Sequence, residues 1–386
     1  MKTIKKIISI LLMTAVILGG VAVGAAAAPA ADGGAMKLDC RSAILMEAST
    51  GEVLYEMNAD EALPPASVTK VMTLLLVMEA IEDGRLALDD TVTASEHACS
   101  MGGSQIYLEP GEQMSARDLL KSVVIASAND AALALAEHIA GTEESFVAMM
   151  NKRASELGMK NTRFENTNGL DDTVTEHVTS ARDIAIMSRE LIKHEKITDF
   201  SSIWMDTIRN GEFGLTNTNR LVRFYKGATG LKTGSTAKAK FCITATAERD
   251  GMTLIAVIMA APTRDIRNAA AVSLLDFGFA NYTVYRNAGG AVSDVSVIGG
   301  VKRSCGAEYP EFSCVLKKSD AGRVSFSLEY EKKAAAPVKA GDKLGRAVYK
   351  IGDREIGGVD ICASETVEKI NFWGLFCRML AKISLC

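Results

Sequence analysis

Three short polar motifs, widely spaced and in a fixed order, are the most constraining feature of this 386-residue sequence. They are Ser-Val-Thr-Lys at 67–70, Ser-Ala-Asn at 127–129 and Lys-Thr-Gly at 232–234. On a helix, the three-residue spacing of Ser67 and Lys70 places both side chains on one face, one turn apart. A serine hydroxyl is a weak nucleophile until a base removes its proton. The first motif therefore predicts a nucleophile with its base, as acyl transfer requires.

The combination of motifs carries more weight than any one of them. A second Ser-x-x-Lys pattern at 235–238 lies next to the third motif, and we interpret it as coincidence. The ordered set SxxK, SxN and KTG is typical of β-lactamases and penicillin-binding proteins. A Ser-His-Asp arrangement is rejected, because none of the four histidines (His97, His138, His177 and His194) accompanies a G-x-S-x-G elbow.

The first 31 residues have the composition of a secretory signal peptide. Three lysines precede an apolar run over 7–23, and small residues fill 25–31. This order of basic, apolar and small-residue segments predicts export, with several possible cleavage sites in the small-residue stretch at 25–31. An uncleaved anchor is the alternative, although the apolar run is short for a membrane span.

The net charge and the length of the mature chain limit its partners and its number of domains. Loss of the leader leaves 40 Lys and Arg against 47 Asp and Glu, so the net charge is about −7. A nucleic-acid partner is excluded because phosphate binding needs a basic surface. About 355 residues suffice for one large core and a small second domain.

The eight cysteines show no metal-binding pattern. They are irregularly spaced, without CxxC pairs or Cys/His clusters, so we expect no metal site. Export permits disulfides. Cys305 and Cys314, which share one β-rich stretch, are the best candidates for a pair, although spacing does not fix connectivity.

The first 281 residues predict an α+β domain. Apolar runs at 42–47 and 52–57 indicate a hairpin, and runs at 240–248 and 252–261 flank an Arg-Asp-Gly turn. Strands at both ends with helices between them predict an antiparallel sheet, flanked by helices, whose first and last strands meet. A helix over 68–81 is apolar nearly all round and should be central, with Ser67 at its N-terminus.

The remaining motifs fall at element ends. Helices are expected at 117–126, 130–139, 145–157, 180–194 and 267–279. The second motif then lies at a helix junction, residues 166–172 form a loop, and the third motif is on or entering a strand. Beyond residue 281, short alternating segments with paired glycines predict a small β domain that ends near Ser364.

The last twenty residues, 367–386, predict an amphipathic helix. Apolar and aromatic residues at helical spacing stand beside Lys369, Arg378 and Lys382. A terminal helix of this composition favours the membrane interface. The alternative is a helix that packs back on the β domain.

The chain resembles the low-molecular-mass penicillin-binding proteins, the D-alanyl-D-alanine carboxypeptidases of serine peptidase family S11. Further segments carry the resemblance, namely 102–104 with 110–111, 168–170, 180–183 and 230–234. It implies a β-lactamase/transpeptidase-like domain over 36–281, an all-β domain over 282–366 and a membrane anchor over 367–386. The implied activity removes the terminal D-alanine from peptidoglycan stem pentapeptides at the outer face of the cytoplasmic membrane. β-Lactams are the implied covalent inhibitors, and no cofactor is implied.

The resemblance also assigns roles to residues. Ser67 forms the acyl-enzyme, Lys70 is the general base and Ser127 relays a proton to the leaving D-alanine. Asn129 holds Lys70 and a substrate amide. Three residues bind the carboxylate of the substrate, namely Lys232, Thr233 and Arg267. Gly234 allows the substrate main chain to approach closely. The main-chain N–H groups of Ser235 and Ser67 form the oxyanion hole. A surface arginine is the alternative for Arg267. Burial and Lys232 should both lower the pKa of Lys70.

Two positions depart from the family pattern: Lys240 stands where a small residue or glycine is common, and Val178 stands where an aromatic residue is common. Two rival functions stay open. A class A β-lactamase also needs a glutamate that activates the deacylating water, and residues 165–168 only loosely imitate that loop. A non-catalytic wall-binding protein would have no need of the intact motifs.

Overall fold

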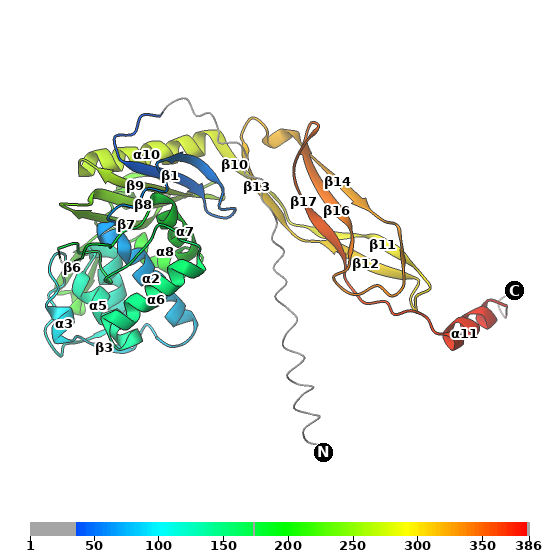
Figure 1. Ribbon diagram of the computed structural model, residues 1–386, viewed down its shortest axis with the longest axis horizontal. Helices are drawn as coiled ribbons and strands as arrows, with labels where there is room; N and C mark the ends of the chain where they lie inside the picture. Colours follow the sequence, from blue (N-terminus) through cyan, green and yellow to red (C-terminus); the bar gives the residue numbers. More distant parts are fainter. Residues whose placement is uncertain (1–35, 173, 384–386) are drawn as a thin grey trace, which may run out of the picture. The chain divides into compact units, whose positions relative to one another are not determined.

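The structure is a computed structural model that describes residues 36–172 and 174–383 (Figure 1). The predicted leader at 1–31 lies outside the described residues. A five-stranded sheet has the order β2-β1-β9-β8-β7. Its strands are β1 Ser42–Glu47, β2 Val53–Met57, β7 Ala228–Thr236, β8 Lys240–Arg249 and β9 Met252–Ala261. Strand β1 pairs antiparallel with β9, so the first and last strands meet as predicted.

Both faces of this sheet are covered. Along β1, Ala43 and Leu45 join the apolar cluster of helix α10 (Arg264–Asn281), whereas Ile44 and Met46 join the cluster of helix α2 (Lys70–Glu82). Figure 1 shows α10 on one side of the sheet and the labelled helices α2, α3, α5, α6, α7 and α8 on the opposite side. The strand alternation therefore fills two cores at once.

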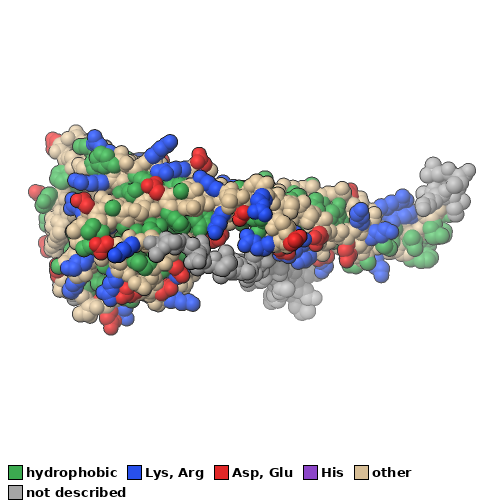
Figure 2. Space-filling view, turned by 90° about the horizontal axis from the view of Figure 1, so that it is seen from above, with side chains coloured by type: hydrophobic (Ala, Val, Ile, Leu, Met, Phe, Trp, Pro, Cys, Tyr) green, Lys and Arg blue, Asp and Glu red, His purple; other side chains and the backbone are tan. Residues whose placement is uncertain are grey.

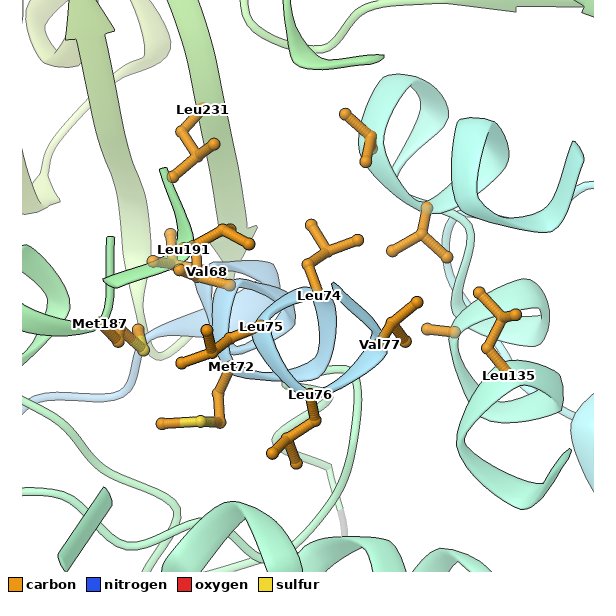
Figure 3. Packing of buried hydrophobic residues seen from close by; sticks show 14 of the residues in the cluster. Val68, Met72, Leu74, Leu75, Leu76, Val77, Leu135, Met187, Leu191 and Leu231 are labelled. Carbon is orange, nitrogen blue, oxygen red and sulfur yellow. The ribbon is translucent and has the colours of Figure 1, made fainter. Parts of the chain in front are cut away.

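Helix α2 is the centre of the larger core. Figure 3 shows its side chains pointing outward all round the axis, against Leu135, Met187, Leu191 and Leu231 of neighbouring elements. The prediction of a buried, central helix is confirmed. Its start differs, because Ser67 lies in a preceding 3₁₀ turn, Ala66–Thr69. Such tight turns are common at helix N-termini.

The other helices follow the predicted order. They are α4 Ala116–Lys121, a π-helical turn Ser122–Ala126, α5 Asn129–Ala140, α6 Glu143–Glu156, α7 Ala181–Leu191 and α8 Lys196–Ser201. Ser127 and Ala128 separate the π turn from α5, so the second motif lies at the predicted helix junction. Helix α7 ends three residues earlier than predicted. Shorter elements are β3 Thr91–Thr93, α3 Glu96–Cys99, β4 Gln113–Ser115, β5 Met205–Ile208, β6 Phe213–Thr216 and α9 Leu221–Phe224.

The C-terminal region is all β, as predicted. Strands β10 (Tyr282–Asn287) and β13 (Phe312–Lys317) form one pair. A six-stranded sheet contains β11 Gly290–Ile298, β12 Ser304–Tyr309, β14 Val324–Tyr330, β15 Lys333–Ala335, β16 Lys343–Ile351 and β17 Arg354–Ala363. The expected disulfide is wrong. Cys305 and Cys314 are both free thiols, because β12 and β13 belong to different sheets.

The terminal helix α11 spans Phe372–Ile383 and is shorter than predicted. Val367 belongs instead to the β core, where it is fully buried and exchanges main-chain hydrogen bonds with Val338. Between 372 and 380 the large apolar side chains of α11 are exposed, Phe372 by 74% and Trp373 by 70% (Figure 2). Arg378 donates to the carbonyls of Gly300 and Val301, so contact with the β domain uses a polar side chain. In the described part of the chain, no helix is both long and apolar enough to cross a bilayer.

Candidate active site

The structure brings the three motifs together from three separate elements. Ser67 comes from the 3₁₀ turn before α2, Ser127 and Asn129 from the start of α5, and the third motif from the edge strand β7. Lys70 and Lys232 join them through hydrogen bonds. The two lysines therefore occupy the centre of one polar site.

Lys70 is fully buried and has three hydrogen-bond acceptors. Its Nζ donates to Ser67 Oγ at 3.0 Å, to Asn129 Oδ1 at 2.5 Å and to the carbonyl of Asn168 at 2.9 Å. Burial lowers the pKa of Lys70 well below its usual value, and the charge of Lys232 lowers it further. In its neutral form the amine donates only two hydrogen bonds, to Asn129 and Asn168, and its lone pair accepts from the Ser67 hydroxyl, which is the arrangement that proton abstraction requires.

Ser127 is held by the second lysine. The Nζ of Lys232 donates to Ser127 Oγ at 2.8 Å and to the carbonyl of Thr233 at 3.0 Å. Ser127 has a left-handed backbone, with φ of 64°. Burial lowers the pKa of Lys232 to about 7, with a further contribution from Arg267. Since Lys232 donates to Ser127 Oγ, the hydroxyl of Ser127 can donate to another group.

Asn129 links the first motif to the loop at 102–104. Its side-chain oxygen accepts from Lys70, while its Nδ2 donates to the carbonyl of Gly102 at 2.6 Å. Its main-chain N–H donates to the carbonyl of Ser104. Both ends of the amide thus have protein partners, and the side chain has a fixed orientation.

At Gly234, strand β7 lies against the 3₁₀ turn Ala66–Thr69, which we call the nucleophile turn because it carries Ser67. A Cβ on Gly234 would lie 2.7 Å from the main-chain nitrogen of Ser67 and 2.9 Å from that of Val68. Real Cβ atoms do not approach so closely. The absence of a side chain at Gly234 therefore lets β7 lie against the main chain of Ser67, as the expected oxyanion hole requires. The side chain of the next residue, Ser235, is exposed.

Arg267 is buried, with 3% exposure, so the surface alternative is wrong. Its guanidinium donates to Asn268 Oδ1 and, at 3.4 Å, to the carbonyl of Cys242. Burial lowers the pKa of Arg267 to about 10. Across the described residues, no carboxylate forms an ion pair with Arg267, Lys70 or Lys232. Any positive charge on Lys232 and Arg267 is therefore not compensated by an ion pair among these residues. Nearby, the hydroxyl of Thr233 donates to Thr218 Oγ1.

The loop at 166–170 supplies contacts for which the sequence assigned no role. The Asn168 carbonyl accepts from Lys70, and Asn166 Oδ1 accepts from the main chain of Gly169. Gly169 has φ of +86°, and a Cβ there would lie 1.9 Å from the carbonyl of Ala66. Only glycine lets this loop pack on the nucleophile turn. The Asn-Gly-Leu signal was visible at 168–170, but its function was not.

Comparison with known proteins identifies the family. The model of the D-alanyl-D-alanine carboxypeptidase family matches residues 25–263, and that of the penicillin-binding protein 5 C-terminal domain matches 279–369. The D-alanyl-D-alanine carboxypeptidase DacF of Bacillus subtilis is 43% identical over 343 residues, which cover 86% of this chain and 87% of DacF. The chain belongs to the D-alanyl-D-alanine carboxypeptidase family.

Solved structures of similar proteins agree with this family membership. Penicillin-binding protein 5 of Haemophilus influenzae is 30% identical, with a TM-score of 0.78, and the match covers 86% of this chain and 98% of that one. Penicillin-binding protein D2 of Listeria monocytogenes, solved in its ampicillin-bound form, is 33% identical with a TM-score of 0.59. That match covers 64% of this chain and 99% of the other.

The buried His177 orients the nucleophile turn of this carboxypeptidase family member. The main-chain N–H of Glu165 donates to His177 Nδ1 at 3.0 Å, so the neutral ring carries its proton on Nε2. Nε2 then donates to Thr69 Oγ1 at 2.7 Å, and the Thr69 hydroxyl donates to the carbonyl of Ala66 at 2.8 Å. Ala66 has a left-handed backbone, with φ of 49°. This chain of hydrogen bonds supports a conformation that alanine rarely adopts.

His177 also predicts a pH dependence of stability. Burial lowers its pKa from 6.5 to about 4. Between these values the unfolded chain binds a proton that the folded chain does not, so the free energy of unfolding falls as the pH drops. Urea denaturation at neutral pH and at about pH 5 should show part of this loss, which reaches about 3 kcal/mol by pH ~4. His177→Gln should flatten this slope and the exposed His138→Gln should not; an unchanged slope in His177→Gln would refute the assignment.

Gly234→Ala should slow acylation of this carboxypeptidase family member by roughly a hundredfold, because the Cβ would displace the Ser67 main chain, whose N–H group is expected to stabilise the oxyanion. Stopped-flow measurement with a fluorescent penicillin tests this. Gly214→Ala is the matched control, since a Cβ there meets nothing within 4 Å. Equal acylation rates in the two variants would contradict the proposed packing.

Two remaining sequence features have structural explanations. Glu165, the candidate for a lactamase-like base, accepts main-chain hydrogen bonds from Thr175 and Glu176. In the second Ser-x-x-Lys pattern, Lys238 donates to the carbonyl of Asp171. Within 36–172 and 174–383, no group of three or more His, Cys, Asp or Glu side chains is arranged to hold a metal ion.

Proposed function

We propose that this protein is a serine-type D-Ala-D-Ala carboxypeptidase that removes the terminal D-alanine from peptidoglycan pentapeptide stems. The observation that carries the proposal is the buried Lys70 amine, 3.0 Å from Ser67 Oγ and with a pKa well below its usual value. Family membership supplies the substrate class, through relatives named D-alanyl-D-alanine carboxypeptidases.

Acylation begins when Lys70 takes the proton of Ser67 and the serine oxygen attacks the carbonyl of the penultimate D-alanine. The main-chain N–H groups of Ser67 and Ser235 stabilise the oxyanion. When the C–N bond breaks, Ser127 donates its proton to the leaving amine. Lys232, whose pKa is about 7 and whose Nζ is 2.8 Å from Ser127 Oγ, can replace that proton. The proton that Lys70 took from Ser67 then passes to the neutral Lys232, so both lysines return to their starting forms. Lys70 next removes a proton from a water that attacks the ester carbonyl, and it gives that proton to the departing Ser67 oxygen.

The terminal carboxylate of the substrate binds beside Lys232, in the middle of β7. Lys232 and Thr233 address it directly, and the buried Arg267 adds positive charge behind them. Neither Lys232 nor Arg267 has a protein carboxylate as an ion-pair partner among the described residues, so the carboxylate of the substrate would compensate their charge. Asn129 fixes Lys70, and Gly234 keeps β7 close to the nucleophile turn.

The decisive experiment incubates the purified mature protein with a pentapeptide stem and measures released D-alanine. Mass spectrometry of the same protein with penicillin should detect a covalent adduct on Ser67. Rapid release of hydrolysed penicillin without an adduct would instead favour a β-lactamase. Neither D-alanine nor an adduct would favour a non-catalytic wall-binding protein. The fixed main-chain contacts of Glu165 count against the lactamase, and the hydrogen-bonded Ser67-Lys70 pair counts against a loss of catalysis.

The domain and location assignments are part of the same proposal. A signal peptide at 1–31 directs export, the catalytic domain spans 36–281, and the β domain spans 282–366. The protein works in the bacterial cell envelope, peripherally at the outer face of the cytoplasmic membrane, in peptidoglycan biosynthesis and cell shape. The exposed apolar side chains of α11 support an interfacial anchor.

Removal of residues 372–386 should release the protein from membranes and leave catalysis in solution unchanged. The cut begins at Phe372, because Val367 belongs to the β core. Each apolar side chain lost removes roughly 1.5 to 3 kcal/mol of burial at full immersion. Sedimentation with membranes, together with D-alanine release, tests both parts. If the leader has been cleaved and the truncated protein still sediments, α11 is not the anchor.

A further inference from the structure

Lys240 is an exposed cation in a backbone conformation that disfavours it. It opens β8, directly after the three-residue turn at 237–239, and its φ is 57°. Hairpin turns of this length commonly use a left-handed residue, usually glycine. A lysine there costs about 1 to 2 kcal/mol of strain. Nothing in the packing of the described residues requires its side chain.

A substrate that binds in an extended form along β7 runs towards Lys240. Under the proposed function, on which this inference rests, the terminal carboxylate lies at Lys232 and the scissile carbonyl at Ser235. The acyl part of an extended substrate therefore continues past Ser235 towards Thr236. Thr236 pairs directly with Lys240 across the hairpin. The acyl part of the substrate thus leaves the site beside the β7–β8 turn.

Next to the β7–β8 turn, the loop that contains Asp171 packs against Thr236 and Lys238. The Thr236 hydroxyl donates to Asp171 Oδ2 at 2.5 Å, and Lys238 donates to the Asp171 carbonyl at 2.5 Å. Asp171 is buried, with 8% exposure, so its carboxylate is already engaged below the surface. Throughout the described residues, neither Lys238 nor Lys240 forms an ion pair with a carboxylate. Of the two, only Lys240 lacks a hydrogen-bond partner in that part of the chain.

We propose that Lys240 binds a carboxylate on the acyl part of the substrate, upstream of the scissile bond, and so favours acidic stem peptides. The strained backbone presents a cation, kept free of protein acceptors, at the point where the acyl part passes. Lys238 adds a second positive charge beside it. Lys240 is a specificity-determining residue that leaves the nucleophile, base and relay untouched.

Two penicillins that differ by one carboxylate test this proposal. Benzylpenicillin and its α-carboxylated analogue carry the same ring system, and the additional charge lies in the acyl side chain. The measured quantity is the ratio of their second-order acylation rates, analogue over parent. In Lys240→Ala this ratio should fall about threefold to fivefold, as expected for loss of one exposed ion pair. The wild-type ratio should also fall with added salt.

Further variants separate the effect of the Lys240 charge from the effect of its strained backbone. Lys240→Gly removes both the charge and the strain, so its ratio should fall as in Lys240→Ala while its melting temperature rises. Lys240→Arg should retain the ratio, and Lys160→Ala, a change at another exposed lysine, should not alter it. An unchanged ratio in both Lys240→Ala and Lys240→Gly would overturn the inference. If neither penicillin acylates the wild type, the proposed function itself fails.

Discussion

The Ser67→Ala protein is expected to release no D-alanine and to form no covalent adduct with penicillin. The acylation rate should fall by roughly 10⁴-fold or more, because the hydroxyl is the acyl acceptor and no other group can take its place. Fold and substrate contacts should persist, since the 3₁₀ turn is fixed by its main chain and by Thr69. Intact-mass spectrometry after incubation with penicillin gives the direct measurement.

The matched control is Ser202→Ala, an exposed serine whose hydroxyl contacts only its own helix end. This variant should be acylated like the wild type. An adduct of penicillin mass on the Ser67→Ala protein would refute the assignment. Mapping that adduct by peptide digestion would then identify the true nucleophile.

The Lys70→Arg protein is expected to be nearly as inactive. A guanidinium cannot lose its proton in the working pH range, so it cannot act as a base. Its planar fork is also larger than the ammonium group that now donates to Ser67, Asn129 and Asn168. Stopped-flow acylation and D-alanine release should both be reduced by roughly 10³-fold.

Lys160→Arg, an exposed change of the same kind, provides the comparison and should retain full activity. A normal melting temperature in Lys70→Arg would separate lost chemistry from lost folding. Acylation above about a tenth of the wild-type rate would argue that Ser127 with water can serve as the base.

The sequence was sufficient to predict the residues whose chemistry depends on type and spacing. The helical spacing of Ser67 and Lys70 predicted their contact, and Nζ lies 3.0 Å from Oγ. Strands at both ends of the first domain predicted the pairing of β1 with β9. These inferences rest on local periodicity and on motif order, which a single sequence displays directly.

Contacts made by main-chain atoms could not be predicted in the same way. The Asn168 carbonyl that accepts from Lys70 carries no residue-specific signal. The role of His177 depends on the Glu165 N–H and on Thr69, which only the folded chain brings together. The expected Cys305–Cys314 disulfide failed because proximity in sequence did not place the two residues in one sheet.

The all-round packing of α2 has a consequence for antibiotic resistance. Ser67 is attached to the most enclosed helix of the domain, where Val71, Leu75 and Val77 are fully buried. A mutation that shifts the nucleophile away from a drug must disturb this core, at a cost of several kcal/mol. Resistance mutations that preserve folding are therefore expected at the margins of the site, in the 102–104 loop and the 237–240 turn. There a changed side chain alters drug entry while the helix stays in place.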